Sequence, residues 1–209
     1  MYIPRAFEEM HTPTLHEQMQ STPLPVLVTD GSQGLTASHI PLLLNPHEGI
    51  YGTLYGHFSR ANPQWQALAE GAEVLVVFAG EQAYVSPSFY PDKAEHGKAV
   101  PTWNYVAVHA YGHAEVFDDA SRLLDLVSRL SNKHEAGRPD PWSVSDAPAD
   151  YIDSMLKAIV GFRLPVTRLL GKRKLSQNRS IKDQTGVREG LLASNNPHDH
   201  ALAHLIAKE

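Results

Sequence analysis

The sequence contains no cysteine. Disulfides and thiolate metal sites both need cysteine, so both are excluded, and the composition agrees with a reducing compartment such as the cytoplasm. Long hydrophobic runs are also missing, because stretches such as EVLVVFAG are too short to cross a bilayer. The first residues, MYIPRAFEEMH, lack the pattern of a secretory signal. We therefore expect a cytoplasmic protein without a membrane partner.

The chain has 209 residues, of which 42% are hydrophobic and 20% are charged, and this composition is typical of a soluble globular protein. Its formal net charge of −5 argues against a surface devoted wholly to nucleic acid. The stretch 164–190 is different, because it holds seven cations and two anions, an excess of +5. This basic stretch is a candidate for binding an anionic partner such as DNA, and a solvated surface explains it equally well.

The first two thirds of the chain are rich in β patterns. Three apolar or alternating runs, PLPVLVTD, LTASHIPLLL (35–44) and GIYGTLYGHF (49–58), are separated by the turn-forming stretches DGSQG and NPHEG. EVLVVFAG and QAYVSP predict two more strands, divided at Gly80 and Glu81. In the run 105–116 every even position is apolar or glycine, whereas the odd positions are rich in histidine and tyrosine. That second face suits a partner surface, with a solvated sheet face as the alternative.

Helical patterns follow the strands. SRANPQWQALAEG predicts a short helix that Asn62 caps, and DDASRLLDLVSRLSNKHE and DAPADYIDSMLKAI predict two longer ones. The run 159–170 predicts a strand interrupted at Pro165, and the C-terminus from about residue 172 to 209 predicts a helical segment. This order indicates a single α+β domain, 1–209, built on an antiparallel sheet or barrel.

The stretch SPSFYPDKAEHGKAVPTWNY (86–105) is far too long for a tight turn between strands. Structureless loops of this size in compact domains usually serve a site or an interface. Its rings at Phe89, Tyr90 and Trp103 can cover an aromatic ligand. We therefore interpret the loop as functional, as a lid or a dimer arm.

No phosphate-loop, dinucleotide or metalloprotease motif is present, so the catalytic residues are unknown and no metal site is predicted. Two other stretches, GHFSRANP and GKRKLSQNR, combine hydroxyls, amides and cations with few carboxylates. Phosphate binding needs cations for charge and hydroxyl or N–H donors for close contact. Ser59 with Arg60, just before a helix start, has this character. Together with the aromatic loop, these stretches indicate a phosphorylated aromatic cofactor.

The loop with its following strand, YVSPSFYPDKAEHGKAVPTWNYVAVHAYGHAEV, together with GHFSRANPQW, ASHIPLLL and GKRKLSQNR, resembles the PaiB-type family of FMN-binding negative transcriptional regulators. The resemblance runs from MYIPRAF to GVREGL, near residue 191. It implies an antiparallel split β-barrel with peripheral helices, similar to pyridoxamine-phosphate oxidase. It further implies a homodimer with FMN in a cleft between the two chains.

The resemblance also implies three groups of FMN contacts. Those near the phosphate and ribityl chain are Ser38, His39, Ser59, Arg60 and Asn62. Those near the flavin ring are Ser86, Ser88, Thr102, Trp103 and Asn104. Those that close the site, from the same or the neighbouring chain, are Lys174, Ser176, Gln177 and Arg179. Three of these residues have a structural alternative: Asn62 can be only a helix cap, Trp103 only a plug at the barrel end or dimer seam, and His39 only a core histidine.

Three functions remain open at this point. The first is a flavin-binding regulator that lowers the expression of other genes, and the second is a flavin-dependent oxidoreductase acting on a small molecule. His96, Lys98, His109 and His113 offer proton donors for the second, although nothing in the sequence distinguishes one of them. The third is a flavin-free dimeric interaction module. If the protein is a flavin-binding regulator, the basic stretch 164–190 is its candidate DNA contact.

Overall fold

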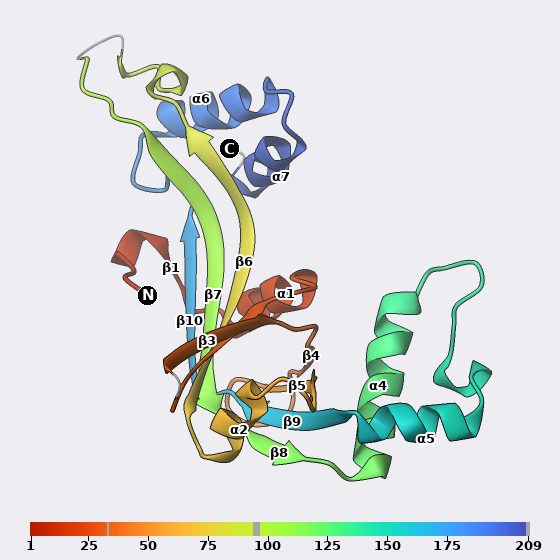
Figure 1. Ribbon diagram of the computed structural model, residues 1–209. Coiled ribbons are helices and arrows are strands. Elements are labelled where there is room, and N and C mark those ends of the chain that lie inside the picture. The colour runs from red at the N-terminus through yellow and green to blue at the C-terminus, as the bar shows by residue number, and fades with distance from the viewer. Residues whose placement is uncertain (33, 94–96, 208–209) are drawn as a thin grey trace. The chain divides into compact units, whose positions relative to one another are not determined.

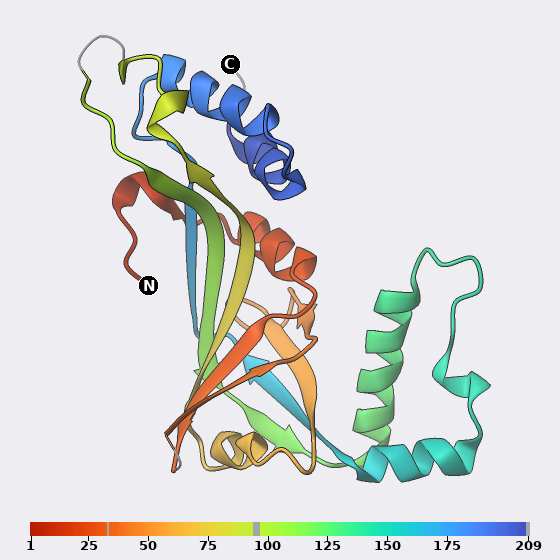
Figure 2. The ribbon, with the colours of Figure 1, turned by 45° about the horizontal axis from the view of Figure 1, so that its top comes forward.

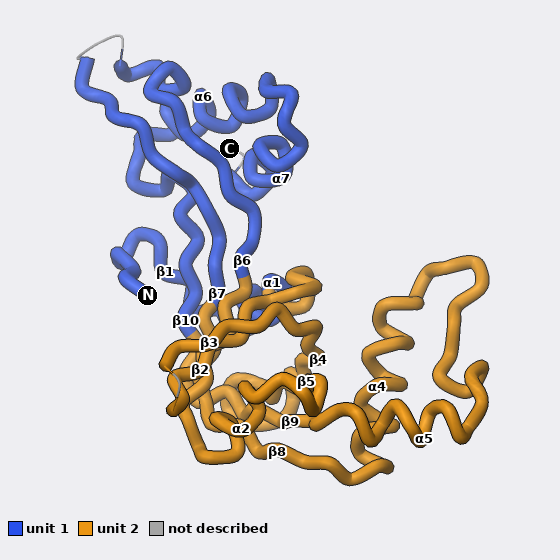
Figure 3. Tube along the Cα trace, viewed as in Figure 1, with its two compact units in different colours: residues 1–18, 79–108, 170–209 blue, residues 19–78, 109–169 orange. Residues whose placement is uncertain are grey.

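The computed structural model describes residues 1–32, 34–93 and 97–207, and the chain divides into two compact units. Unit 1 comprises Met1–Gln18, Ala79–Val108 and Leu170–Glu209, and unit 2 comprises Met19–Phe78 and His109–Leu169 (Figure 3). Two long strands, β6 (Glu73–Val85) and β7 (Thr102–His113), each contribute residues to both units. The prediction of one domain, 1–209, stays a prediction.

Unit 2 contains strands from two antiparallel sheets. In the first, β2 pairs with β3 in a hairpin and with β6 on its other side. The second has the order β4-β5-β9-β8, and each of its pairings is antiparallel. The strands are β2 (Val26–Gly31), β3 (Gly34–His39), β4 (Leu43–Asn45), β5 (Thr53–Ser59), β8 (Glu115–Phe117) and β9 (Ile159–Pro165).

The run 35–44 was predicted as one strand, and that prediction is wrong in its continuity. β3 ends at His39 and β4 begins at Leu43, and the two strands belong to different sheets. Pro41 lies in the break, and proline has no N–H to donate to a strand ladder. The predicted turn DGSQG connects β2 to β3, although its Gln33 lies outside the described residues.

Helices of unit 2 lie beside its second sheet (Figures 1 and 2). α4 (Ala120–Glu135) and α5 (Ala149–Lys157) share a buried apolar cluster with strand residues, which includes Phe117 and Leu123. Asp119 caps α4, because its side chain accepts a hydrogen bond from the Arg122 N–H at 2.9 Å. A Cβ added to Gly161 would collide with the Phe117 ring, so glycine permits this close approach. Short α2 (Gln64–Ala69) and the 3-10 turn η3 (Val144–Asp146) complete the unit.

Unit 1 is built on the strand order β1-β10-β7-β6. Two C-terminal helices lie beside the end of β6 in both views (Figures 1 and 2), and their side chains share a buried cluster with Val85 and Val106. The elements are β1 (Glu8–Glu9), β10 (Arg168–Lys174), α1 (Thr12–Ser21), α6 (Ile181–Leu192), α7 (Pro197–Leu205) and the 3-10 turns η1 (Arg5–Phe7) and η2 (Pro87–Phe89). The C-terminal helices therefore begin later than residue 172, because β10 continues to Lys174.

The two strands predicted around Gly80 are one continuous strand, β6. A Cβ at Gly80 would lie within 3 Å of the Gln18 side chain, so this glycine marks a close contact rather than a turn. The alternation predicted for 105–116 is confirmed in part. Val106, Val108 and Ala110 are buried within β7, but Ala107 of the other face is buried as well. The run is also divided, because β7 ends at His113 and β8 belongs to the second sheet. None of the described helices is long and apolar enough to span a membrane.

Candidate functional site

Gln64, in the first turn of α2, joins two of the predicted phosphate residues of unit 2, Ser38 and Asn62, into one network. Its side-chain Nε2 donates to Thr29 Oγ1 at 3.1 Å and to the Thr36 carbonyl at 3.0 Å. The Ser38 hydroxyl donates to Gln64 Oε1 at 2.5 Å, and Asn62 Nδ2 donates to Ser38 Oγ at 3.2 Å. Asn62 also caps the helix, because its Oδ1 accepts the Gln64 backbone N–H at 3.0 Å. The network fixes Ser38 and Asn62 side by side.

Arg60 follows β5 and connects it to the start of β9. Its guanidinium donates to the carbonyls of Lys157 and Ile159 at 3.0 and 3.1 Å, and its backbone N–H donates to Ala158. Asp118 lies 3.8 Å from the guanidinium, which is 42% exposed. A cavity of about 610 Å³, the size of many ligand pockets, is lined by Arg60 and Lys157 and also by Asp118 and Asp153. Arg60 therefore has a structural role and still presents positive charge to an open cavity.

Ser59 and His39 both lie at exposed strand ends in unit 2. Ser59 Oγ accepts the Ala61 N–H at 3.4 Å, and Ser59 pairs in register with Ile159. His39 is the last residue of β3, opposite Val26. The interpretation of His39 as a core histidine is therefore wrong, whereas its contact with a ligand stays a prediction.

Lys174 lies at the centre of the predicted residues of unit 1. Its ammonium donates to the Thr102 hydroxyl and, at 2.7 Å, to the Trp103 carbonyl. Burial lowers the pKa of Lys174 below the ordinary lysine value, and the positive charges of Lys172 and Arg179 lower it further. An anion bound beside this amine would relieve that repulsion.

Asn104 and Ser176 form a second, fully buried pair in unit 1. Asn104 is 0% exposed, and its Nδ2 donates to Ser176 Oγ at 2.8 Å. Its Oδ1 is buried and has no hydrogen-bond partner among the residues that the structure describes. Ser176 has a φ of +67°, a left-handed conformation that side chains rarely adopt. Strained residues with unsatisfied polar neighbours often mark functional sites.

The remaining predicted residues of unit 1 hold the surrounding turns. Gln177 accepts from the Leu175 N–H at 2.7 Å through Oε1, and the Arg179 guanidinium lies 4.8 Å from the Tyr90 ring. Ser86 caps η2, because its Oγ accepts the Ser88 N–H at 3.2 Å and lies 2.8 Å from Ser88 Oγ.

The Trp103 side chain is 53% exposed and forms an edge contact with Tyr84, whose ring centroid is 6.1 Å away. A ring of this exposure is free to cover a ligand or another chain. The structure thus places the predicted contacts in two groups, one in each unit. His96, one of the candidate proton donors, lies outside the described residues.

The chemistry of these groups fits FMN. A phosphate needs cations and hydroxyl donors, which Arg60 with Ser59 and Lys174 with Thr102 supply. The exposed Trp103 face matches a flat aromatic ring.

Sequence reasoning missed Gln64 and a cluster of three arginines in unit 2, Arg122, Arg129 and Arg163. Gln64 carried no signal, because a glutamine in a first helical turn is ordinary. The arginine cluster depends on pairs such as Arg163 with Glu48, which are 115 residues apart, and one sequence does not reveal contacts of that range.

Comparison with known proteins identifies the class. The family model described as "Putative FMN-binding domain" matches residues 1–168, so the chain belongs to this family of FMN-binding domains, and FMN is its cofactor. The chain is 34% identical over 206 residues to "Protease synthase and sporulation protein PAI 2" of Bacillus subtilis, a match that covers 99% of this chain and 96% of the relative. This relative places the chain in the PaiB-type group that its motifs resemble.

A second relative and one solved structure are also similar to this chain. An uncharacterised protein of Aspergillus fumigatus is 37% identical, with coverage of 91% of this chain and 90% of the relative. The solved structure of the FAD and heme binding protein from Mycobacterium smegmatis aligns with a TM-score of 0.60 at 18% identity, over 85% of this chain and 78% of that chain. At that identity the likeness shows the fold, which is the predicted α+β antiparallel split barrel with peripheral helices.

The position of Lys174 gives a testable electrostatic prediction. Replacing Arg179 with glutamine removes one nearby positive charge, so the pKa of Lys174 should rise toward 10.5. The measurement is a pH titration of the lysine side-chain carbons by NMR. Arg5→Gln serves as the control, since Arg5 is exposed and is not among the groups that shift this pKa. An unchanged Lys174 titration in Arg179→Gln would show that this repulsion is absent.

Proposed function

We propose that the protein is a cytoplasmic FMN-binding regulator of the PaiB type, which lowers the expression of other genes as a homodimer. The observation that carries this proposal is the match to the Bacillus sporulation protein, which extends over nearly the full length of both chains. A shared domain alone would support only flavin binding, whereas a full-length match supports a shared biological role.

In this proposal the polar residues of unit 2 and those of unit 1 stay two separate sets of predicted FMN contacts, from the same or the neighbouring chain. Ser59 and Arg60, with Ser38 and Asn62 fixed beside Gln64, supply donors for the phosphate and ribityl chain. Thr102, Trp103 and Asn104 face the ring, and the Lys174 ammonium neutralises negative charge. Bound FMN supplies redox chemistry, so its oxidation state is a signal that such a regulator can sense.

The homodimer is supported by β3. It is the terminal strand of its sheet, and most of its residues are exposed, with Leu35 78% exposed. Proteins usually protect an exposed sheet edge by covering it, and a second copy is the simplest cover. Sedimentation equilibrium that gave only the monomer mass at micromolar concentrations would contradict this assembly.

Several cations of the basic stretch already have partners within the chain. Arg168 pairs with Glu73 at 3.2 Å, and Lys172, which is buried, donates to the Tyr2 carbonyl at 3.1 Å. Lys182 pairs with Asp92 at 3.4 Å. These contacts compete with DNA phosphates, so DNA binding through 164–190 is the weakest part of the proposal and has its own test.

FMN titration tests the cofactor contacts. The wild-type protein should quench flavin fluorescence on binding, and Arg60→Ala and Lys174→Gln should each weaken binding about tenfold, because each removes a hydrogen bond to a charged group. Arg138→Gln is the matched control, since Arg138 is 63% exposed and pairs with Glu135, the last residue of α4.

Arg60 also contacts two carbonyls, so each variant needs a thermal melt beside the titration. A folded Lys174→Gln protein with wild-type affinity would remove Lys174 from the FMN site. If the wild-type protein had no measurable FMN affinity, the result would contradict the cofactor proposal and favour a flavin-free dimeric interaction module.

A gel-shift experiment tests direct DNA contact. At about 50 mM salt the protein should retard DNA that carries its target promoter, and binding should weaken steeply as salt rises, because phosphate contacts release counterions. Absence of a shift at that salt would remove direct DNA binding. Turnover of a reduced nicotinamide in the same preparation would then favour the oxidoreductase.

A further inference from the structure

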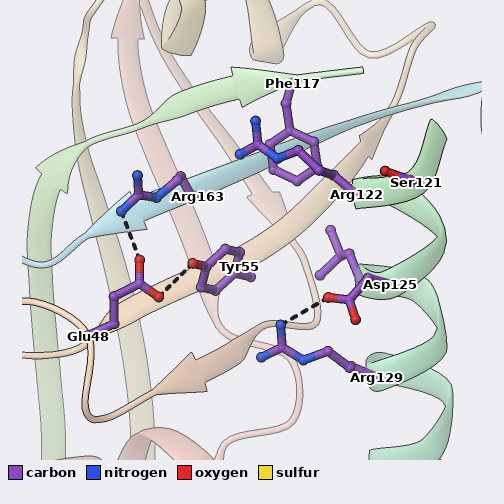
Figure 4. Close-up of a pocket in the computed structure, with 9 residues that line it drawn as sticks. Glu48, Tyr55, Phe117, Ser121, Arg122, Asp125, Arg129 and Arg163 are labelled. Carbon is purple, nitrogen blue, oxygen red and sulfur yellow. Dashed lines mark hydrogen bonds and ion pairs between the residues drawn. The ribbon is translucent and has the colours of Figure 1, made fainter. Parts of the chain in front are cut away.

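Unit 2 contains an arginine-lined cavity of about 500 Å³ that involves none of the predicted FMN contacts. Figure 4 shows Arg122, Asp125 and Arg129 extending from α4 toward Tyr55 and Arg163 on the neighbouring strands. This volume falls in the usual range for pockets that hold small molecules. The residues that line it are Glu48, Tyr55, Phe117, Ser121, Arg122, Asp125, Leu126, Arg129 and Arg163.

The three guanidinium groups are held in fixed positions. Arg163 donates to Glu48 at 2.8 Å and to Glu115 at 3.2 Å. Arg122 donates to Glu115 at 3.0 Å, and its guanidinium lies 3.9 Å from the centre of the Phe117 ring. Such stacking and pairing orient a guanidinium before any ligand arrives, which lowers the entropic cost of binding.

Arg129 completes the set. It pairs with Asp125 at 3.2 Å, one turn earlier in α4, and its guanidinium lies 5.6 Å from the centre of the Tyr55 ring. Exposed pairs of this kind contribute little to stability, so Arg129 can be replaced without unfolding the protein.

The cavity has more donors than acceptors. Both oxygens of Glu48 are occupied, one by Arg163 and the other by the Tyr55 hydroxyl at 2.6 Å and by Asn45. Both oxygens of Glu115 accept from arginines. Each arginine carries five N–H groups, and the buried Nε of Arg163 has no partner among the described residues. The remaining arginine N–H groups therefore lack hydrogen-bond acceptors.

The charges of this group balance. Three arginines face Glu48 and Asp125 in the lining, and Glu115 beside it pairs with Arg122 and Arg163. The hydrogen bond from Tyr55 is the largest influence that lowers the pKa of Glu48, and burial raises the pKa of Tyr55. Glu48 therefore stays ionised and Tyr55 stays protonated at neutral pH, so their hydrogen bond persists. The arginine N–H groups that the carboxylates leave over are the donors available to a ligand.

We propose that this cavity is a second ligand site, which binds a small organic monocarboxylate with a flat or apolar body. The carboxylate accepts hydrogen bonds from the guanidinium groups, whose planar fork matches its two oxygens. Tyr55, Phe117 and Leu126 contact the apolar body. The site gives the protein a way to respond to an organic acid independently of its flavin.

Calorimetric titration of the full chain with benzoate, in buffer low in chloride, tests the site. Wild-type protein should bind one benzoate saturably, with a dissociation constant of about 1 mM or lower. Arg129→Gln should weaken binding about tenfold, and Arg129→Lys should weaken it too, because lysine keeps the charge and loses the fork. Benzamide, which has the same shape without the charge, should bind at least about tenfold more weakly.

Arg138→Gln is again the matched control, since Arg138 lies just beyond the end of α4 and outside the cavity, and it should bind benzoate like the wild type. FMN affinity should be unchanged in Arg129→Gln, which separates this site from the flavin contacts. Absence of saturable benzoate binding by folded wild-type protein would overturn the proposal. Equal benzoate affinity in Arg129→Gln, equal affinity for benzamide, or a parallel loss of FMN affinity would overturn it as well.

Discussion

The buried amide of Gln64 is the constraint on which the phosphate side of the candidate site depends. A side-chain amide that is only 4% exposed must find partners within the protein, because an unsatisfied buried polar group costs about 1–3 kcal/mol. Gln64 meets this need by bonding to β2, to the β3 carbonyl of Thr36 and to Ser38. The hairpin and α2 are thereby locked together, and Asn62 follows because it caps the same helix. The geometry of Ser38 and Asn62 is therefore set by the packing of Gln64, which is not itself a predicted FMN contact.

Local chemistry was predictable from the sequence, whereas long-range contacts were not. Asn62 was recognised as a cap because capping needs only a short polar side chain before a helix. The alternation in β7 was visible because strand periodicity is local. The break at Pro41 and the close contact at Gly80 were misread, since both depend on what lies opposite in space. The FMN residues came from motif resemblance, and the arginine cavity was missed because Glu48 and Arg163 meet only in the fold.

Flavin binding and gene regulation have different support in this molecule. The family match and the donor chemistry of the two residue groups support FMN directly. Regulation depends on the relationship to the Bacillus protein, and the basic stretch that suggested DNA is largely committed elsewhere. Lys172 is buried, and Arg179 lies over Tyr90, so neither is a free surface cation. Much of the positive charge in 164–190 therefore has a role in the chain's own structure.

The left-handed backbone at Ser176 limits which amino-acid substitutions the KLSQNR turn can accept without losing stability. Glycine would adopt this conformation without strain and would relieve roughly 1–2 kcal/mol. The same substitution would remove the hydroxyl that accepts from Asn104 at 2.8 Å, and an unpaired buried donor costs about as much. Alanine would keep the strain and also lose the bond. The turn is thus held between two opposing penalties, and a single substitution at this position toward either simpler residue brings no gain in stability.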